Sequence, residues 1–245
     1  MVDQPNLLRH NEYKINEHIS ICVPTVGEIF DYGDQKYFGI SQSLTSTPFD
    51  LMVQLDDIGI DYEEVTEFQL FCMMFQSIVK QDDISLIFKG DIDFTQFQEA
   101  ENTKTGERAL WIKDTDISID RLTQIQICNA IRAIHLWEYN DKKAGNAEAK
   151  AYLLERDRKR QKRAAKKPYR SFLEDTIVAL VNTEEFKYDY NTVMDLSVYK
   201  LNVSLQQIQK KKQWEQLISG AYSGTVDLSK MNIDKLNWLS PVNDR

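Results

Sequence analysis

Residues 65–79, VTEFQLFCMMFQSIV, carry the apolar pattern around which the first part of the chain is built. Apolar side chains recur there at three- and four-residue steps, the period of an α-helix with one face in a core. Between Leu70 and Phe75 nearly every residue is apolar, so we expect this helix to be deeply buried. Asp61, with Glu64 three residues later, predicts a capping box at its start.

The residues upstream of this helix predict short strands, turns and one further helix. Residues 19–40 first alternate apolar and polar side chains and then contain Pro24 and several glycines, a pattern typical of strands and turns. A helix is expected to begin at Thr47 and Pro48, because threonine caps helices and proline suits the first helical position. Gly59 is expected to end that helix.

Downstream, the sequence predicts strands and then a second helix. Ile84, Leu86 and Phe88 lie at alternate positions, which predicts a strand over residues 84–88. A hairpin is expected next, with arms near residues 94–99 and 108–113. Apolar residues then recur at helical spacing across residues 120–140. Together with the buried helix, these elements predict an α+β domain over residues 1–141.

Residues 142–170 differ sharply in charge from the rest of the chain. They contain twelve Lys or Arg against three Asp or Glu, a net of +9, whereas the whole chain carries −8, so the remainder sums to −17. Alanine and leucine, which are good helix formers, are frequent in this segment. We therefore expect an exposed basic helical linker between two domains.

The last part of the chain predicts a helical domain over residues 171–245. Ser171 and Glu174 form a capping box that opens a helix of about ten residues. Residues 192–219 predict a longer amphipathic helix, which Gly220 ends. Its apolar side is expected to contain Met194, Leu201, Leu205, Ile208, Trp214, Leu217 and Ile218. The expected fold is thus α+β and helix-rich, with an N-terminal α+β domain, a long basic connecting helix and a C-terminal helical unit.

No residue pattern predicts a catalytic, cofactor or metal site. The three cysteines are widely spaced and form no CxxC pair, which is typical of free thiols in a reducing compartment. His10, His18 and His135 lack the spacing of metal ligands. Residues 77–80 and 104–106 match the SxxK and KTG elements of penicillin-interacting enzymes, but they lie too close together and no Ser-Asn element accompanies them. We expect a non-enzymatic protein; an active site assembled from scattered acids is the alternative that needs a structure to test.

The basic segment is the one feature with a positive functional argument. At helical spacing its charges repel one another and gain from an anionic partner. That partner is an acidic protein, nucleic acid or the acidic remainder of this chain, and the sequence leaves the choice open. Tyr152 and Tyr169 only flank the run, so base stacking has little support. The candidate binding residues are Arg156, Arg158, Lys159, Arg160, Lys162, Arg163, Lys166, Lys167 and Arg170.

Two stretches carry a family likeness. The first is Met194 to Leu239, especially LISGAYSGTVDLSKMNIDKLNWL at residues 217–239. The second is PTVGEI at residues 24–29, followed by YF at 37–38, LT at 44–45, Asp50, GID at 59–61 and EF at 67–68. Both are similar to proteins from the tail gene clusters of phages that infect Gram-positive bacteria. The resemblance implies a tail assembly chaperone or minor tail component that binds the tape-measure or tube protein, in the bacterial host cytoplasm or in the virion. It transfers no functional residue.

A second candidate surface lies on the long C-terminal helix, where Trp214, Leu217, Ile218 and Tyr222 could contact a partner or form intramolecular core. The alternative function is a nucleic-acid-binding accessory protein that uses residues 156–170. No signal peptide is recognisable, and no window approaches the roughly 18 apolar residues of a membrane span. We therefore expect a protein that acts in aqueous solution, without a membrane partner.

Overall fold

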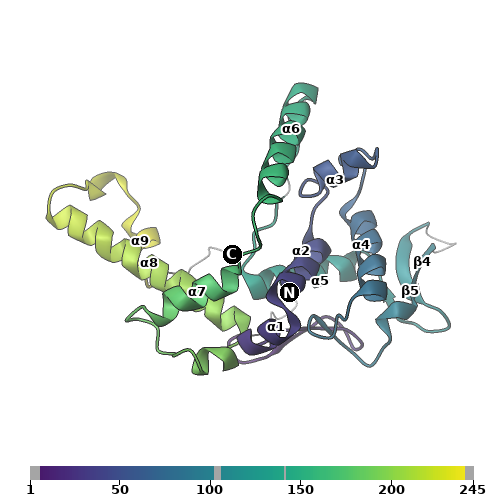
Figure 1. Cartoon of the computed structure of the whole chain (residues 1–245), viewed down its shortest axis with the longest axis horizontal. Helices are drawn as coiled ribbons and strands as arrows, with labels where there is room; N and C mark the ends of the chain where they lie inside the picture. The colour runs from purple at the N-terminus through teal and green to yellow at the C-terminus, as the bar shows by residue number, and fades with distance from the viewer. Residues whose placement is uncertain (1–5, 102–105, 141, 241–245) are drawn as a thin grey trace.

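The computed structural model describes residues 6–101, 106–140 and 142–240. The fold is α+β and helix-rich, as the sequence predicts. Figure 1 shows a central body from which α6 (Ala147–Ala164) rises on one side, while α8 (Val198–Tyr222) extends away from the hairpin at the opposite end. The molecule is therefore elongated, and two of its helices project from the body.

The N-terminal sheet is small, and two helices follow it directly. Strands β1 (Glu12–Lys14), β2 (Ser20–Cys22) and β3 (Phe88–Lys89) are antiparallel in that order. Helices α1 (Val26–Tyr32) and α2 (Asp34–Thr45) come next. The prediction of strands and turns over residues 19–40 is thus wrong beyond β2.

A capping box explains these two unexpected helices. Thr25 accepts a hydrogen bond from the Glu28 backbone N–H, and the Glu28 carboxylate accepts one from the Thr25 N–H. Buried Val26, Ile29 and Tyr37 then follow at helical rather than strand spacing. Gly33, at a φ of +97°, makes the break between the helices without a steric cost.

Helices α3 (Met52–Asp57) and α4 (Glu67–Gln81) lie where helices are expected, but both begin later than predicted. The true capping box of α4 is formed by Thr66 and Gln69, because each accepts a hydrogen bond from the backbone of the other. Leu70 and Phe75 are fully buried, so the prediction of a deeply buried helix is confirmed. The strand predicted at residues 84–88 is shorter, because residues 84–87 form a turn before β3.

The predicted hairpin is present and forms a second sheet. It consists of β4 (Phe97–Glu101), β5 (Arg108–Ile112) and β6 (Ser118–Ile119), preceded by the 3-10 turn η1 (Phe94–Gln96). The predicted turn at residues 102–106 lies mostly outside the described residues. Helix α5 (Arg121–His135) follows, and Leu136 ends it in the left-handed conformation, earlier than residue 140.

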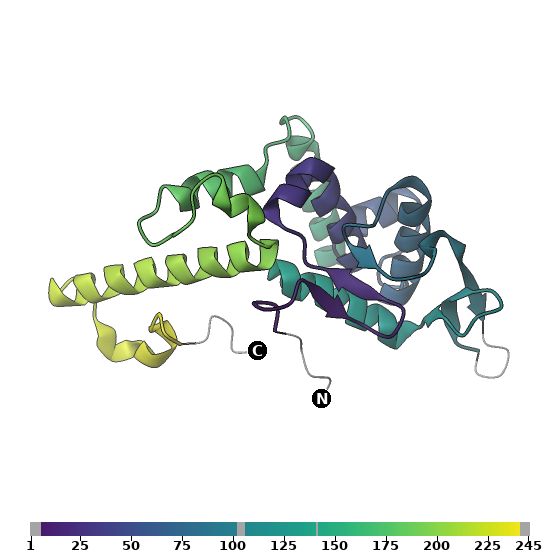
Figure 2. The same ribbon diagram turned by 90° about the horizontal axis from the view of Figure 1, so that it is seen from below.

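The C-terminal part is helical. Ser171 caps α7 (Phe172–Val181) through the Glu174 N–H, and η2 (Thr192–Asp195) precedes α8. The predicted one-sided apolar face of α8 is wrong, because apolar residues surround the helix and none of its described side chains after Leu201 is buried. Gly220 lies within α8 and does not end it. Figure 2 shows the following segment, with η3 (Leu228–Lys230) and α9 (Ile233–Leu236), returning alongside α8.

One continuous core joins the N-terminal and C-terminal parts of the chain. Val26 and Ile29 belong to the same buried cluster as Val193 and Leu201. The backbone joins the two parts as well, since the Val26 N–H donates to the Leu196 carbonyl and the Val198 N–H donates to the Pro24 carbonyl, both at 2.9 Å. The division at residues 141 and 170 stays a prediction, and the hydrophobic core continues across it.

Candidate partner-binding surface on α6

Capping and terminal charges stabilise α6. The Asn146 side chain accepts a hydrogen bond from the Ala149 N–H at 2.8 Å, which caps the helix. Glu148 lies in the first turn and Lys162 and Arg163 in the last, so the charges complement the helix dipole at both ends. The predicted basic helix is therefore present over Ala147–Ala164, and most of its side chains are exposed.

An apolar contact fixes the inner face of α6, the face directed at α3. Leu153 and Leu154 are half-buried and pack against a small core cluster that includes Met52 and Leu55 of α3. Asp157, next along this face, is only 5 % exposed and accepts a hydrogen bond from Gln161 at 2.8 Å. The apolar surface buried at this contact holds the basic helix against the body.

Carboxylates neutralise the cations of the inner face. Arg158 donates to Asp56 at 2.5 Å and to Asp57 at 2.6 Å. Lys150 lies 2.5 Å from Asp61 and 3.0 Å from Glu63. The hydrogen bond from Lys150 holds the pKa of Asp61 below its ordinary value. These two cations are already paired and are not free for a partner.

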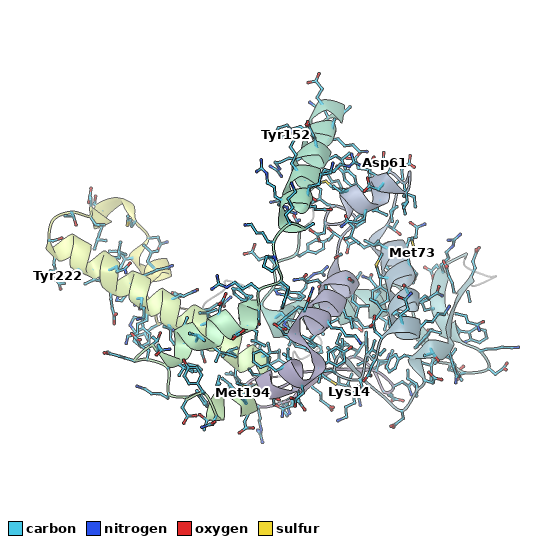
Figure 3. All side chains as sticks on the ribbon, viewed as in Figure 1. Lys14, Asp61, Met73, Tyr152, Met194 and Tyr222 are labelled. Carbon is cyan, nitrogen blue, oxygen red and sulfur yellow. The ribbon has the colours of Figure 1, made fainter. Side chains whose placement is uncertain are left out.

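The outer face of α6 carries a second set of cations. Arg156, Arg160 and Arg163 follow at steps of four and three residues on α6 and so form one stripe about 10 Å long at 1.5 Å per residue, and Lys167 lies three residues beyond the end of the helix. They line a shallow groove together with Tyr152. Figure 3 places Tyr152 on the side of α6 away from Asp61. The stripe therefore faces away from Asp61, and the acids that pair with its cations are Glu155 and Asp157 of α6 itself.

The outer cations differ in how far they are neutralised. Arg160 lies 2.5 Å from Asp157, although its side chain is 78 % exposed, and Lys159 lies 2.6 Å from Glu155. Arg156 lies 6.0 Å from the centre of the Tyr152 ring. Within the described residues, no ion pair is formed by Lys162, Arg163, Lys166 or Lys167. We call Tyr152, Arg156, Lys159, Arg160, Arg163 and Lys167 the outer stripe.

The structure separates the candidate cations that the sequence grouped together. Arg158 points to α3, Arg170 pairs with Asp175 of α7 at 2.6 Å, and Lys166 lies beyond the end of the helix. The sequence left the acidic remainder of the chain open as a partner, but it did not identify Asp56, Asp57, Asp61 and Glu63 as the acids of the inner face. The half-buried pair Leu153 and Leu154 inside a basic helix is the signal that could have revealed an inner face.

The candidate surface on α8 is partly covered and partly exposed. Trp214, Leu217 and Ile218 are half-buried, whereas Tyr222 is 90 % exposed. The returning tail covers part of this helix, since the Gln207 side chain donates to the Trp238 carbonyl at 2.7 Å. The close approach requires Gly220, where an added Cβ would lie 2.7 Å from the Val226 Cγ2 atom. The chain itself therefore supplies part of the contact expected from a partner.

The described residues contain no cluster of three or more His, Cys, Asp or Glu side chains that could hold a metal ion. Cys22, Cys72 and Cys128 are free, and burial raises the pKa of the Cys22 and Cys128 thiols to about 11. His135 is buried, and its Nε2 atom lies 3.0 Å from the Tyr37 hydroxyl.

In the part of the chain that the structure describes, no helix combines the length and apolarity that a bilayer crossing requires.

One family model matches this chain. The model is that of the YomV second domain, and it matches residues 162–243, which are 82 of the 245 residues. The matched segment begins in the last turn of α6 and continues through α7, α8 and the returning tail. The family is phage-derived, since YomV is a protein of the Bacillus phage SPbeta region. A phage likeness is thereby supported for this third of the chain. Neither the curated proteins nor the solved structures gave a match.

Proposed function

We propose that this chain is a non-enzymatic phage protein that binds an acidic partner protein through the outer stripe of α6. The observation that carries the proposal is the division of one basic helix into two faces. Its inner cations Lys150 and Arg158 contact the chain's own carboxylates. Its outer face keeps Arg163 and Lys167 without ion pairs in the described part of the chain.

The spacing of the stripe favours a helical partner. Cations at steps of four and three residues face the same side of α6, as acids at those steps would on a second helix. Unpaired like charges on one face repel one another, so an acidic surface relieves that repulsion. The chain as a whole carries −8, which opposes the approach of a polyanion, whereas a partner with a local acidic patch needs only the stripe.

Tail morphogenesis is the role we propose for this binding. The phage-derived family of residues 162–243 and the likeness to tail gene-cluster proteins support it. The chain would act as a tail assembly chaperone or a minor tail component, with the tape-measure or tube protein as partner. It would work in the bacterial host cytoplasm and, as a minor tail component, in the virion.

Co-expression tests the proposal. The full chain and a fragment of the tape-measure protein of the same phage are produced together, and we expect the fragment to become soluble and to co-purify. The triple variant Arg156→Glu, Arg163→Glu, Lys167→Glu should lose this effect. The matched control is Lys14→Glu, Lys80→Glu, Lys113→Glu, which makes the same charge change at exposed lysines elsewhere. Failure of the unsubstituted chain, or equal behaviour of both variants, contradicts the proposal.

One observation favours the nucleic-acid alternative, namely the exposed Tyr152 ring beside Arg156. Proteins that bind single strands stack successive bases on several aromatic rings, and the outer stripe offers one. A salt titration with duplex and single-stranded DNA distinguishes the two functions. Phosphate contacts require log K to fall linearly with log salt. We expect no binding at physiological salt; tight binding with that slope would replace the protein partner by nucleic acid.

A further inference from the structure

A cavity of about 660 Å³ lies between the start of α4 and α5, away from the outer stripe. Phe49, Val65 and Ile125 supply apolar wall, and Arg132, Gln124 and Asn140 supply polar groups. Apolar walls with a few polar groups are the usual composition of a ligand site. A ligand site in this cavity is independent of the proposed function of the outer stripe.

Arg132 is a buried cation with no paired carboxylate among the described residues. Only 9 % of the residue is exposed, and its guanidinium donates to the Thr45 carbonyl at 2.5 Å and lies 4.9 Å from the centre of the Tyr139 ring. No carboxylate of the described residues forms an ion pair with it. Burial of an unpaired charge is costly, and a guanidinium has five N–H donors. The remaining donors are therefore suited to an anion that enters the cavity.

The two acids of the cavity are already engaged. Glu67 accepts a hydrogen bond from the Tyr139 hydroxyl, and Glu63 pairs with Lys150. Arg121 also lines the cavity and forms no ion pair within the described part of the chain. The lining carries four cationic side chains, with Lys142 and Lys143 beside the two arginines, against two carboxylates, so the field inside the cavity favours a negative ligand.

Asn140 supplies a complementary acceptor. Its Nδ2 group donates to Asp50 at 2.7 Å, while its Oδ1 atom is buried and has no hydrogen-bond partner among the described residues. A buried acceptor without a donor costs free energy. The cavity thus offers a guanidinium for a carboxylate, an oxygen for an N–H group and an apolar wall.

We infer that this cavity binds a carboxylate that carries an adjacent amide N–H and an apolar side chain. Arg132 would take the carboxylate, Asn140 the N–H, and Phe49, Val65 and Ile125 the side chain. Both an N-acylated apolar amino acid and the C-terminal residue of a peptide have this chemistry. The ligand is thus either a free small molecule or the end of another chain.

Calorimetry with three probes tests the site on the full-length protein. N-acetylphenylalanine should bind, and N-acetylphenylalaninamide, which lacks the carboxylate, should bind roughly tenfold more weakly or worse, because a hydrogen bond to a charged group is lost. A hexapeptide with a C-terminal phenylalanine separates the two sources. It should bind more tightly than the free acid when the natural ligand is a chain end, and no more tightly when it is a small molecule.

Two variants locate the binding. Ile125→Glu places a carboxylate in the cavity wall at a side chain that is 40 % exposed, so the fold should persist and N-acetylphenylalanine should no longer bind. Leu122→Glu is the control, since Leu122 is on the same helix, is 64 % exposed and does not line the cavity. Arg132→Met should also abolish binding, with circular dichroism as the check of folding. No binding of the acid at millimolar concentration, or unchanged binding in Ile125→Glu, would overturn the inference.

Discussion

The guanidinium of Arg158 in α6 lies 2.5 Å from the carboxylate of Asp56 in α3, a residue 102 positions earlier in the chain. This ion pair lies on the inner face of the basic helix, which Leu153 and Leu154 hold against α3. That contact sets Lys150 and Arg158 inward and leaves Arg156, Arg163 and Lys167 on the outer side. The binding surface that we propose is therefore a consequence of how the helix is held against α3.

Removal of the acids should loosen α6 without unfolding the protein. In Asp56→Asn, Asp57→Asn we expect faster amide exchange over Ala147–Ala164 and a loss of at most about 1 kcal/mol in the free energy of unfolding, because the pair is partly exposed and water screens it. Hydrogen-exchange mass spectrometry measures the first and urea unfolding the second. Asp91→Asn, Asp116→Asn makes the same charge change elsewhere and should leave exchange in α6 unaltered.

Truncation of the apolar contact should have the larger effect. Leu153→Ala and Leu154→Ala each remove half-buried side-chain atoms from the cluster against α3. We expect each to cost about 1–2 kcal/mol, less than the 2–5 kcal/mol of a fully buried leucine. Leu122→Ala, at a 64 % exposed site on α5, is the control. If exchange in α6 were the same in all three variants, the helix would not be held by this contact.

The shared core predicts that the chain unfolds as one unit. Leu201 is fully buried in the cluster that also contains Val26 and Ile29. Leu201→Ala should cost about 2–5 kcal/mol and should lower the exchange protection of α1 and α4 together with that of α7. Urea unfolding should remain a single transition by circular dichroism and by fluorescence. Two transitions, the first confined to residues 171–245, would show instead that the predicted C-terminal domain folds separately.

His135 should make the stability depend on pH. Burial lowers the pKa of this imidazole from 6.5 to about 3. The folded chain holds the ring neutral, whereas the unfolded chain binds a proton below pH 6.5. The free energy of unfolding should therefore fall, by about 1.4 kcal/mol per pH unit, as the pH is lowered from about 6.5 towards 3.

The variant His135→Gln isolates this contribution. Its unfolding free energy should vary less between pH 6.5 and pH 5 than that of the unsubstituted chain, above the range in which most carboxylates titrate. His10→Asn, at an exposed site, is the control and should keep the original slope. An unchanged slope in His135→Gln would contradict the role of the buried imidazole.

Local patterns predicted α4, α6 and α7 well, because apolar period, helix formers and capping residues agree in those segments. They failed at residues 26–40, where glycines and a preceding alternation suggested turns but two helices form. The helix is decided there by the reciprocal capping hydrogen bonds of Thr25 and Glu28, which are followed by buried residues at helical spacing. The first and last residues of the helices were predicted less well than the helices themselves, since Thr66 and not Asp61 caps α4.

The candidate site was predictable only in part. The concentration of cations in one helix is a property of the sequence, and so is its exposure. The pairing of Arg158 with Asp56 spans 102 positions and depends on the tertiary fold, so no local pattern contains it. The same holds for the cavity around Arg132, whose walls come from two separate segments within residues 47–68 and 121–143 and not from one motif.

The affinity of the tape-measure fragment for α6 is the measurement that decides whether the outer stripe binds a partner. Calorimetric titration of the folded chain should give a Kd that rises roughly tenfold or more in Arg156→Glu, Arg163→Glu and that also rises with salt, because the contact is electrostatic and exposed. The control Lys14→Glu, Lys80→Glu should keep the original Kd. An affinity that is the same for both variants at every salt concentration would contradict the claim that the outer stripe of α6 is the binding surface.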